Sequence, residues 1–130
     1  MTVVRGVAVG ACVLALCACG KSTQKPVALL AAKSATGRHA SATASFTFAV
    51  LRSLSVRVKA TPAQGVKGGW VVSCKGGIQL SRKSADFAGR TPLKVVVHYA
   101  PIPHPRCEFV AEATLARSGR VRVELRGRRP

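Results

Sequence analysis

The amino-acid sequence predicts an all-β fold, a small antiparallel β-sandwich, and three observations lead to this prediction. Between Phe46 and Leu125, apolar and polar residues alternate with a period of two, as in strands that bury one face. Glycine and proline turn signals separate the alternating runs at short intervals. Two cysteines, Cys74 and Cys107, fall on the predicted inward faces of separate strands. Several short alternating strands at this spacing are typical of a sandwich.

Six segments show the strand pattern clearly, and each places its larger apolar side chains on one face. In the last segment Val121, Val123 and Leu125 face one way and charged residues face the other. We expect the sandwich domain to cover residues 46–126, with two shorter strands around 78–80 and 85–88 and a basic tail at 127–130. The six clear segments are 46–50, 54–58, 70–74, 93–99, 107–115 and 121–125.

The last two strands are predicted to form a hairpin. A two-residue loop at Ser118 and Gly119 would place the apolar Leu115 opposite Arg122, whereas a loop that also includes Arg117 pairs Leu115 with Val121. The three-residue loop is therefore expected, with Gly119 as its left-handed residue. The same register pairs Ala113 with Val123 and Ala111 with Leu125, and places Glu112 opposite Glu124 on the outer surface.

The residues before this domain are rich in Ala, Ser, Thr and Lys and are predicted to be a tether over 19–45. As a flexible chain, such a segment has a root-mean-square span of ~28 Å and a maximum of ~90 Å. Pro26 and the apolar residues after it are also compatible with two turns of a marginal helix.

The first twenty residues have the pattern of an export signal. Arg5 precedes an apolar run from Gly6 to Ala18, which is too short for a membrane-spanning helix of about 20 residues. The run ends in Leu16-Cys17-Ala18-Cys19-Gly20, which resembles the lipobox of bacterial lipoproteins. The resemblance implies a signal peptide at 1–18, lipidation of Cys19, and a location on the outer face of the cytoplasmic membrane. Cleavage as an ordinary secreted protein is the alternative.

Charge is the most unusual property of the composition. The chain has 21 Lys and Arg against 4 acidic residues, and because only Arg5 lies in the signal, the mature part would carry +16. Such a field attracts anionic partners such as phospholipid headgroups and envelope polymers. Specific recognition of nucleic acid is not expected, because nearly all aromatic residues are assigned to inward faces. Basic residues on predicted outward or loop positions are Arg57, Lys59, Arg117, Arg120, Arg122, Arg126, Arg128 and Arg129.

The cysteines outside the signal are Cys74 and Cys107, and an even pair in an exported domain predicts one disulfide. It is expected to cross the core beside Trp70. This arrangement resembles immunoglobulin-type packing, although here Trp70 precedes Cys74 on the same strand and Pro105 occupies the position of that family's tyrosine. The mature part also resembles small exported immunoglobulin-like β domains of high-GC Gram-positive bacteria, which have no assigned activity.

No catalytic residue, metal ligand or cofactor is predicted. The mature chain contains no nucleophile elbow, phosphate-binding glycine loop or HExxH motif. Cys74, His98, His104 and Cys107 would match a zinc site in number, but the spacing from His98 to Cys107 fits no compact knuckle. A disulfide with surface histidines is the favoured interpretation.

Two surfaces are candidates for binding. The Pro-rich segment 99–106 is expected to be stiff, either as a surface that presents Tyr99, Ile102 and His104 or, preferably, as a rigid connector. The second candidate is the basic face, with Arg120, Arg122 and Arg126 on the last strand. We expect a monomeric, lipid-anchored binding or structural protein of the cell envelope whose partner is an envelope protein or an anionic polymer. The alternative is a secreted inhibitor or effector of an extracellular enzyme.

Overall fold

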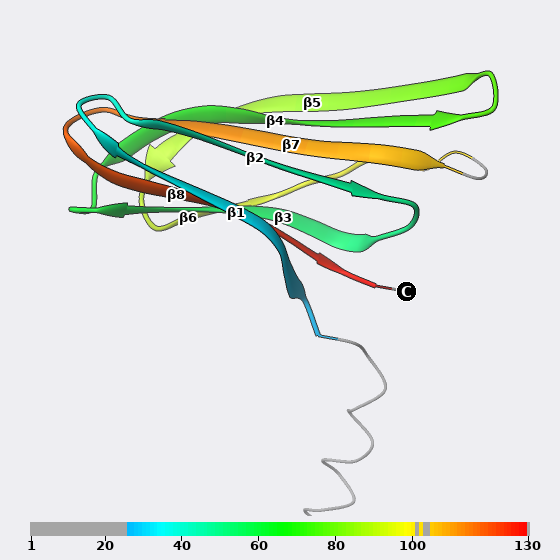
Figure 1. The fold of residues 1–130 in the computed structure, drawn as a ribbon, viewed down its shortest axis with the longest axis horizontal. Coiled ribbons are helices and arrows are strands. Elements are labelled where there is room, and N and C mark those ends of the chain that lie inside the picture. Colours follow the sequence, from blue (N-terminus) through cyan, green and yellow to red (C-terminus); the bar gives the residue numbers. More distant parts are fainter. Residues whose placement is uncertain (1–25, 101, 103–104, 130) are drawn as a thin grey trace, which may run out of the picture.

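Eight strands in two antiparallel sheets make up the structure, a computed structural model that describes residues 26–100, 102 and 105–129 (Figure 1). This confirms the predicted all-β sandwich. Within these residues no helix is long and apolar enough to cross a membrane. The predicted signal, Cys19 and His104 lie outside the described residues. The strands are β1 (Ala28–Gly37), β2 (Ser41–Phe48), β3 (Arg52–Thr61), β4 (Gly65–Gly76), β5 (Gln79–Arg90), β6 (Leu93–Val96), β7 (Arg106–Leu115) and β8 (Gly119–Arg128).

The strand order is that of a jelly roll. One sheet, called sheet A, has the order β1-β8-β3-β6, and the other, sheet B, has the order β2-β7-β4-β5. This pairing of two four-stranded sheets by nested Greek keys defines the jelly-roll topology. The likeness to immunoglobulin domains therefore extends to the sandwich architecture and not to the connections between strands.

The predicted hairpin between the last two strands is wrong, because β7 and β8 lie in different sheets. Val121 pairs with Ala60 and Ala35 in sheet A, whereas Leu115 pairs with Val66 in sheet B. Both strands still bury the predicted faces, so the apolar pattern does not distinguish pairing within a sheet from packing across the core. Gly119 is needed for another reason, since a Cβ there would lie 2.7 Å from the Thr61 carbonyl oxygen.

The tether predicted over 19–45 is too long, and the short helix after Pro26 is wrong. β1 and most of β2 occupy this region, and β1 pairs with β8 over most of its length. The alanines that made the segment resemble a linker are core residues: Ala40, Ala42 and Ala44 are buried and fill a narrow part of the sandwich. Pairing with the inner strands β8 and β7 overrides the weak strand propensity of alanine. The basic tail is also shorter than predicted, because β8 extends to Arg128.

The disulfide between Cys74 and Cys107 is confirmed, but it does not cross the core. The two cysteines are direct partners in the antiparallel pair β4–β7 of sheet B, with Cα atoms 4.0 Å apart. Both are buried. Along the chain, β5 and β6 lie between the two cysteines. The bond therefore links the two ends of the segment that passes from sheet B into sheet A and back to sheet B.

Strand directions give the sandwich two different ends. At the closed end, four short turns connect β1 to β2, β3 to β4, β5 to β6 and β7 to β8. The buried Gln64 side chain ties the β3–β4 turn to the β7–β8 turn, donating to the Ser118 carbonyl at 3.2 Å and accepting from the Arg117 amide at 2.7 Å. At the open end, on the right of Figure 1, lie the β2–β3, β4–β5 and β6–β7 connections and the ends of β1 and β8 from which the chain leaves the sandwich.

We expect loss of the disulfide to lower the melting temperature by ~15 °C or more, because closing a loop with a sequence separation of 33 stabilises the fold by about 4 kcal/mol. Thermal unfolding followed by circular dichroism, with and without dithiothreitol, measures this effect. The Cys74→Ala, Cys107→Ala double variant should match the reduced protein. An unchanged melting curve on reduction would contradict this role.

Candidate anion-binding face

The outward face of sheet A is strongly basic because successive side chains of its strands alternate between the core and the outer surface. Val56, Val58, Val123 and Leu125 point into the core and are fully buried, so the alternate residues of β3 and β8 must point outward. Those alternate residues are mainly Lys and Arg, and Lys94 of β6 pairs with Arg57 on the same side. We define the basic face by Arg52, Arg57, Lys59, Lys94, Arg120, Arg122, Arg126 and Arg128.

A single carboxylate, that of Glu124, lies in the middle of the basic face and is covered by its neighbours. Arg122 Nε donates to Oε2 at 2.9 Å, and Arg126 Nη2 donates to Oε1 at 3.2 Å. Lys59 Nζ lies 3.6 Å from Oε2. The Glu124 side chain is only 5% exposed, and its cover consists largely of these long side chains. The hydrogen bond from Arg122 is the main cause that lowers the Glu124 pKa, with smaller contributions from Arg126 and Lys59, while burial acts in the opposite direction.

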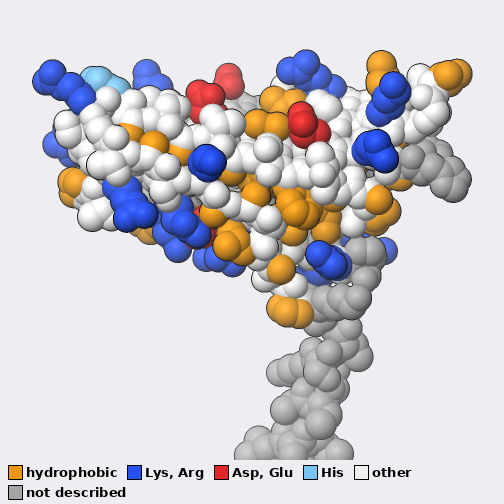
Figure 2. Space-filling view, in the orientation of Figure 1, with side chains coloured by type: hydrophobic (Ala, Val, Ile, Leu, Met, Phe, Trp, Pro, Cys, Tyr) orange, Lys and Arg blue, Asp and Glu red, His pale blue; other side chains and the backbone are white. Residues whose placement is uncertain are grey.

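Glu124 therefore does not face Glu112, as the predicted hairpin register required. Glu124 lies opposite Arg57 and Ala32 in sheet A, and the exposed Glu112 lies on sheet B, where Thr43 Oγ1 donates to it at 3.3 Å. The remaining acidic residues, Asp86 and Glu108, are also on the outer side of sheet B. The outer side of sheet B therefore carries three carboxylates together with Lys67, Lys75, Arg82, Arg90 and Arg106, whereas the basic face of sheet A has Glu124 as its one carboxylate. In Figure 2 most of the visible acidic side chains lie over the upper sheet, and basic side chains are seen along both the upper and the lower margins.

A groove of about 850 Å³ lies at the open end of the basic face. Its base includes apolar groups of Leu54, Val97 and Tyr99, and Val27 and Val96 are part of its wall. Five basic side chains from three strands also line it: Arg52, Arg57, Lys94, Arg126 and Arg128. The arrangement combines cationic groups with apolar surface, as a site for an anionic group on a partly apolar ligand requires.

Two local features of the groove are unusual. The register of β3 against β8 shifts between Arg52 and Ser55, and Ser53 has φ of 55°, a left-handed conformation that is uncommon outside glycine. Such strain is concentrated at functional sites. In addition, the buried Arg128 Nε has no hydrogen-bond partner among the described residues. A buried donor of this kind is costly unless a ligand or water accepts from it.

The structure brings together the predicted site residues of β8. Arg120, Arg122 and Arg126 share the basic face, and two of them are engaged by Glu124. Sequence reasoning missed Arg52 and Lys94, which complete the groove. Their neighbours in space come from distant segments, so only the strand order could have revealed them.

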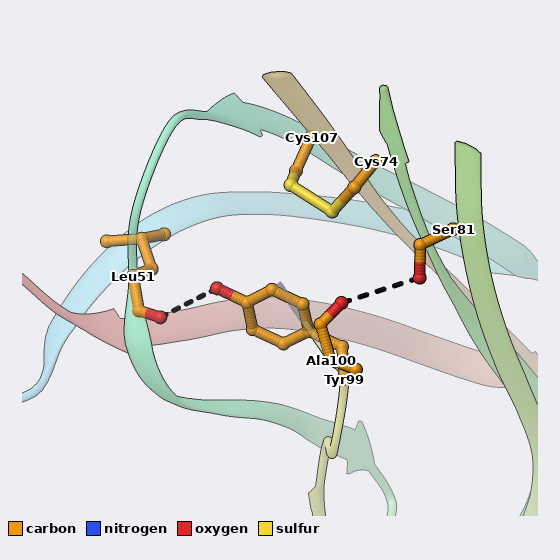
Figure 3. Close-up of a disulfide and its surroundings, with 6 residues drawn as sticks. All are labelled: Leu51, Cys74, Ser81, Tyr99, Ala100 and Cys107. Carbon is orange, nitrogen blue, oxygen red and sulfur yellow. Dashed lines mark hydrogen bonds between the residues drawn. A yellow bond between two sulfur atoms is a disulfide. The ribbon is translucent and has the colours of Figure 1, made fainter. Parts of the chain in front are cut away.

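Tyr99 and Ile102 of the Pro-rich segment, which were predicted as possible partner contacts, have structural roles within the described residues. Tyr99 Oη donates to the Leu51 carbonyl at 2.8 Å (Figure 3). The Tyr99 ring packs edge-to-face on Phe48, with ring centroids 5.7 Å apart. Burial raises the Tyr99 pKa, partly offset by this hydrogen bond. Ile102 is half-buried against the core, and Ser81 Oγ donates to the Ala100 carbonyl at 3.4 Å. These contacts favour the connector interpretation.

Metal binding at the two cysteines is excluded by their disulfide, since neither sulfur is a free thiolate. Comparison of the sequence with protein-family models finds no matching family, and comparison with curated proteins finds no match. The class defined by fold and site is a jelly-roll domain with one basic sheet face.

We expect Glu124→Gln to destabilise the protein by about 1–2 kcal/mol at neutral pH, because it leaves three partly exposed cations without their anionic partner. The folded-state pKa of Glu124 lies below its ordinary value of 4.5. Its stabilisation is therefore present above pH 4.5 and is lost as the pH falls through the folded pKa.

Urea unfolding of the wild type and the variant between pH 3 and 7 measures this contribution. The difference between them should shrink as the pH falls below ~4.5. Glu112→Gln is the matched control, because it removes an exposed carboxylate from the other sheet. A difference between wild type and Glu124→Gln that does not change with pH would contradict the assignment.

Proposed function

We propose that this protein is a lipid-anchored, extracytoplasmic binding protein of the bacterial cell envelope. The lipobox-like ending at Cys19 supports the anchor. The Cys74–Cys107 disulfide supports an oxidising compartment outside the cytoplasm. A binding role is favoured over catalysis because the most distinctive surface is a basic sheet face with no general acid or base positioned beside a nucleophile.

The ligand we propose for the basic face is an anionic polymer of the envelope. The observation that carries this proposal is the excess of positive charge on the basic face, whose one carboxylate is already bound by Arg122, Arg126 and Lys59. Arg52, Arg57 and Lys94 make no ion pair within 4.0 Å among the described residues and line the groove. They are therefore available to phosphate or carboxylate groups of a ligand.

Binding would act through the physical chemistry of polyelectrolytes. Each Lys or Arg that neutralises a phosphate releases a condensed counterion, so affinity falls steeply with salt. Arginine adds paired hydrogen bonds to an anionic oxygen, and the rigid sheet keeps the charged groups at fixed spacings. The apolar base of the groove would add contacts that salt does not screen.

We expect the triple variant Arg52→Gln, Arg57→Gln, Lys94→Gln to lose affinity for a synthetic poly(glycerol phosphate). The slope of log affinity against log salt should become shallower by about 2, since up to three phosphate contacts are lost. Calorimetric titration between 50 and 500 mM salt measures both quantities.

The matched control is Lys67→Gln, Lys83→Gln, Arg90→Gln, which removes the same charge from β4 and β5. Equal losses in the two variants would show that net charge alone drives binding and would contradict a site on sheet A. Two duplex DNAs of different sequence, titrated in parallel, should bind equally, as expected for attraction without base recognition.

The anchor is tested separately with Cys19→Ala. We expect the native protein to sediment with membranes and to carry a diacylglycerol-sized mass increment, and we expect the variant to lose both. Intact mass spectrometry and membrane fractionation measure the two properties. A native chain without the increment, starting near Lys21 and found in the medium, would overturn the anchor and support a secreted inhibitor or effector.

A further inference from the structure

The exposed apolar side chains of the described residues are gathered at the open end of the sandwich. Six large hydrophobic residues are exposed, and every one lies at the start or end of a strand, or in a connection, at this end. The alternation that buries every second residue between the sheets does not account for these six side chains, because all of them are exposed. They are Val27, Leu29, Val50, Ile78, Leu80 and Val96.

The β4–β5 turn carries the two most exposed of these side chains. Ile78 is 100% exposed and Leu80 is 78% exposed. The turn is tight, with Gly77 at φ of 60°, and β4 and β5 are the longest strands, with 12 residues each. Their hairpin extends to the far right of Figure 1, well past the β2–β3 turn. Its apolar tip is therefore presented to whatever lies beyond this end.

Basic side chains of sheet B flank this apolar tip. Lys75 pairs with Leu80 on one side and with Arg106 on the other, and Arg82 follows on β5. Glu108 is the nearest acidic residue along sheet B, opposite Ser73. An apolar tip beside Lys75, Arg82 and Arg106 is complementary to the surface of an anionic bilayer, whose charged headgroups lie above an apolar interior.

We propose that the open end docks onto an anionic lipid bilayer, with Ile78 and Leu80 inserted below the headgroups. The direction of docking rests on the proposed anchor at Cys19. Apart from Pro26, Val27 is the described residue nearest to Cys19 in the sequence, and it belongs to the same end of the sandwich. Two inserted side chains suffice for a second membrane contact beside a lipid anchor. A stable protein interface normally buries above ~1,000 Å², which a two-residue tip does not supply.

Docking in this orientation leaves the basic face accessible. The strands run from the open end to the closed end, so both sheets would stand upright on the bilayer. Sheet A would then present its arginines sideways to envelope polymers, and the closed end would be the most distant from the membrane. The membrane contact and the polymer site are thus different surfaces of one domain.

The test uses the mature protein recovered from cells, with Ile78→Trp as a reporter of insertion. The native Trp70 is buried, at 7% exposure, and gives a constant background. Vesicles of phosphatidylglycerol should shift the emission of the variant to shorter wavelength, and brominated acyl chains should quench it. Vesicles of phosphatidylcholine should cause much smaller changes, because Lys75, Arg82 and Arg106 have no anionic surface to bind.

The matched control is Ser118→Trp, which places the reporter in the β7–β8 turn at the closed end, between Arg117 and Arg120. We expect no shift and no quenching there, and we expect Lys75→Gln, Arg82→Gln to abolish the phosphatidylglycerol response of the Ile78→Trp protein. No response at position 78, or an equal response at 78 and 118, would overturn docking by the open end. Because lipidation is read from the intact mass and polymer binding from calorimetry, failure here is distinguishable from failure of the proposed function.

Discussion

Val56 and Val58 of β3 and Val121, Val123 and Leu125 of β8 have no exposed surface, and they face Phe109 and the alanines of sheet B across a single core. Two sheets packed ~10 Å apart can bury only one side of each strand. Once these side chains point inward, the alternate residues are forced onto the outer faces. The position of nearly every charged residue in β3, β7 and β8 follows from that constraint.

The concentration of positive charge on the outer face of sheet A is a consequence of this alternation. β3 and β8 alternate valine with Lys and Arg, whereas the three exposed carboxylates are carried by β5 and β7. Because β3 and β8 are neighbours, their basic residues add to one field rather than being interleaved with the acidic ones. Glu124 relieves part of the repulsion that results, by hydrogen bonding to residues on either side of it along β8.

Local pattern was sufficient to predict β3, β4, β6, β7 and β8, their buried faces and the disulfide partners, because each depends on residues two apart or on a count of cysteines. It divided β5 into two short strands at 78–80 and 85–88, whereas the structure has one. It could not predict which sheet a strand joins: Leu115 and Val121 are buried whether β7 and β8 pair or face each other across the core. It also misassigned β1 and β2, since Ala40, Ala42 and Ala44 are small enough for a linker and are equally suited to a buried core. The groove needed the full strand order, because Arg52 and Lys94 meet only through β3 and β6.

The early start of β1 bears on how far an anchored domain could search for its ligand. Nine residue steps separate Cys19 from Ala28, which span at most ~32 Å, whereas a tether up to Phe46 would span ~90 Å. The root-mean-square span of a flexible link grows with the square root of its length, so a link one third as long would confine the domain to a volume about five times smaller. Its effective concentration at the membrane surface rises by the same factor. Weak contacts with that surface would therefore be populated without high intrinsic affinity, and ligands beyond the first few nanometres of the envelope would have to come to the protein.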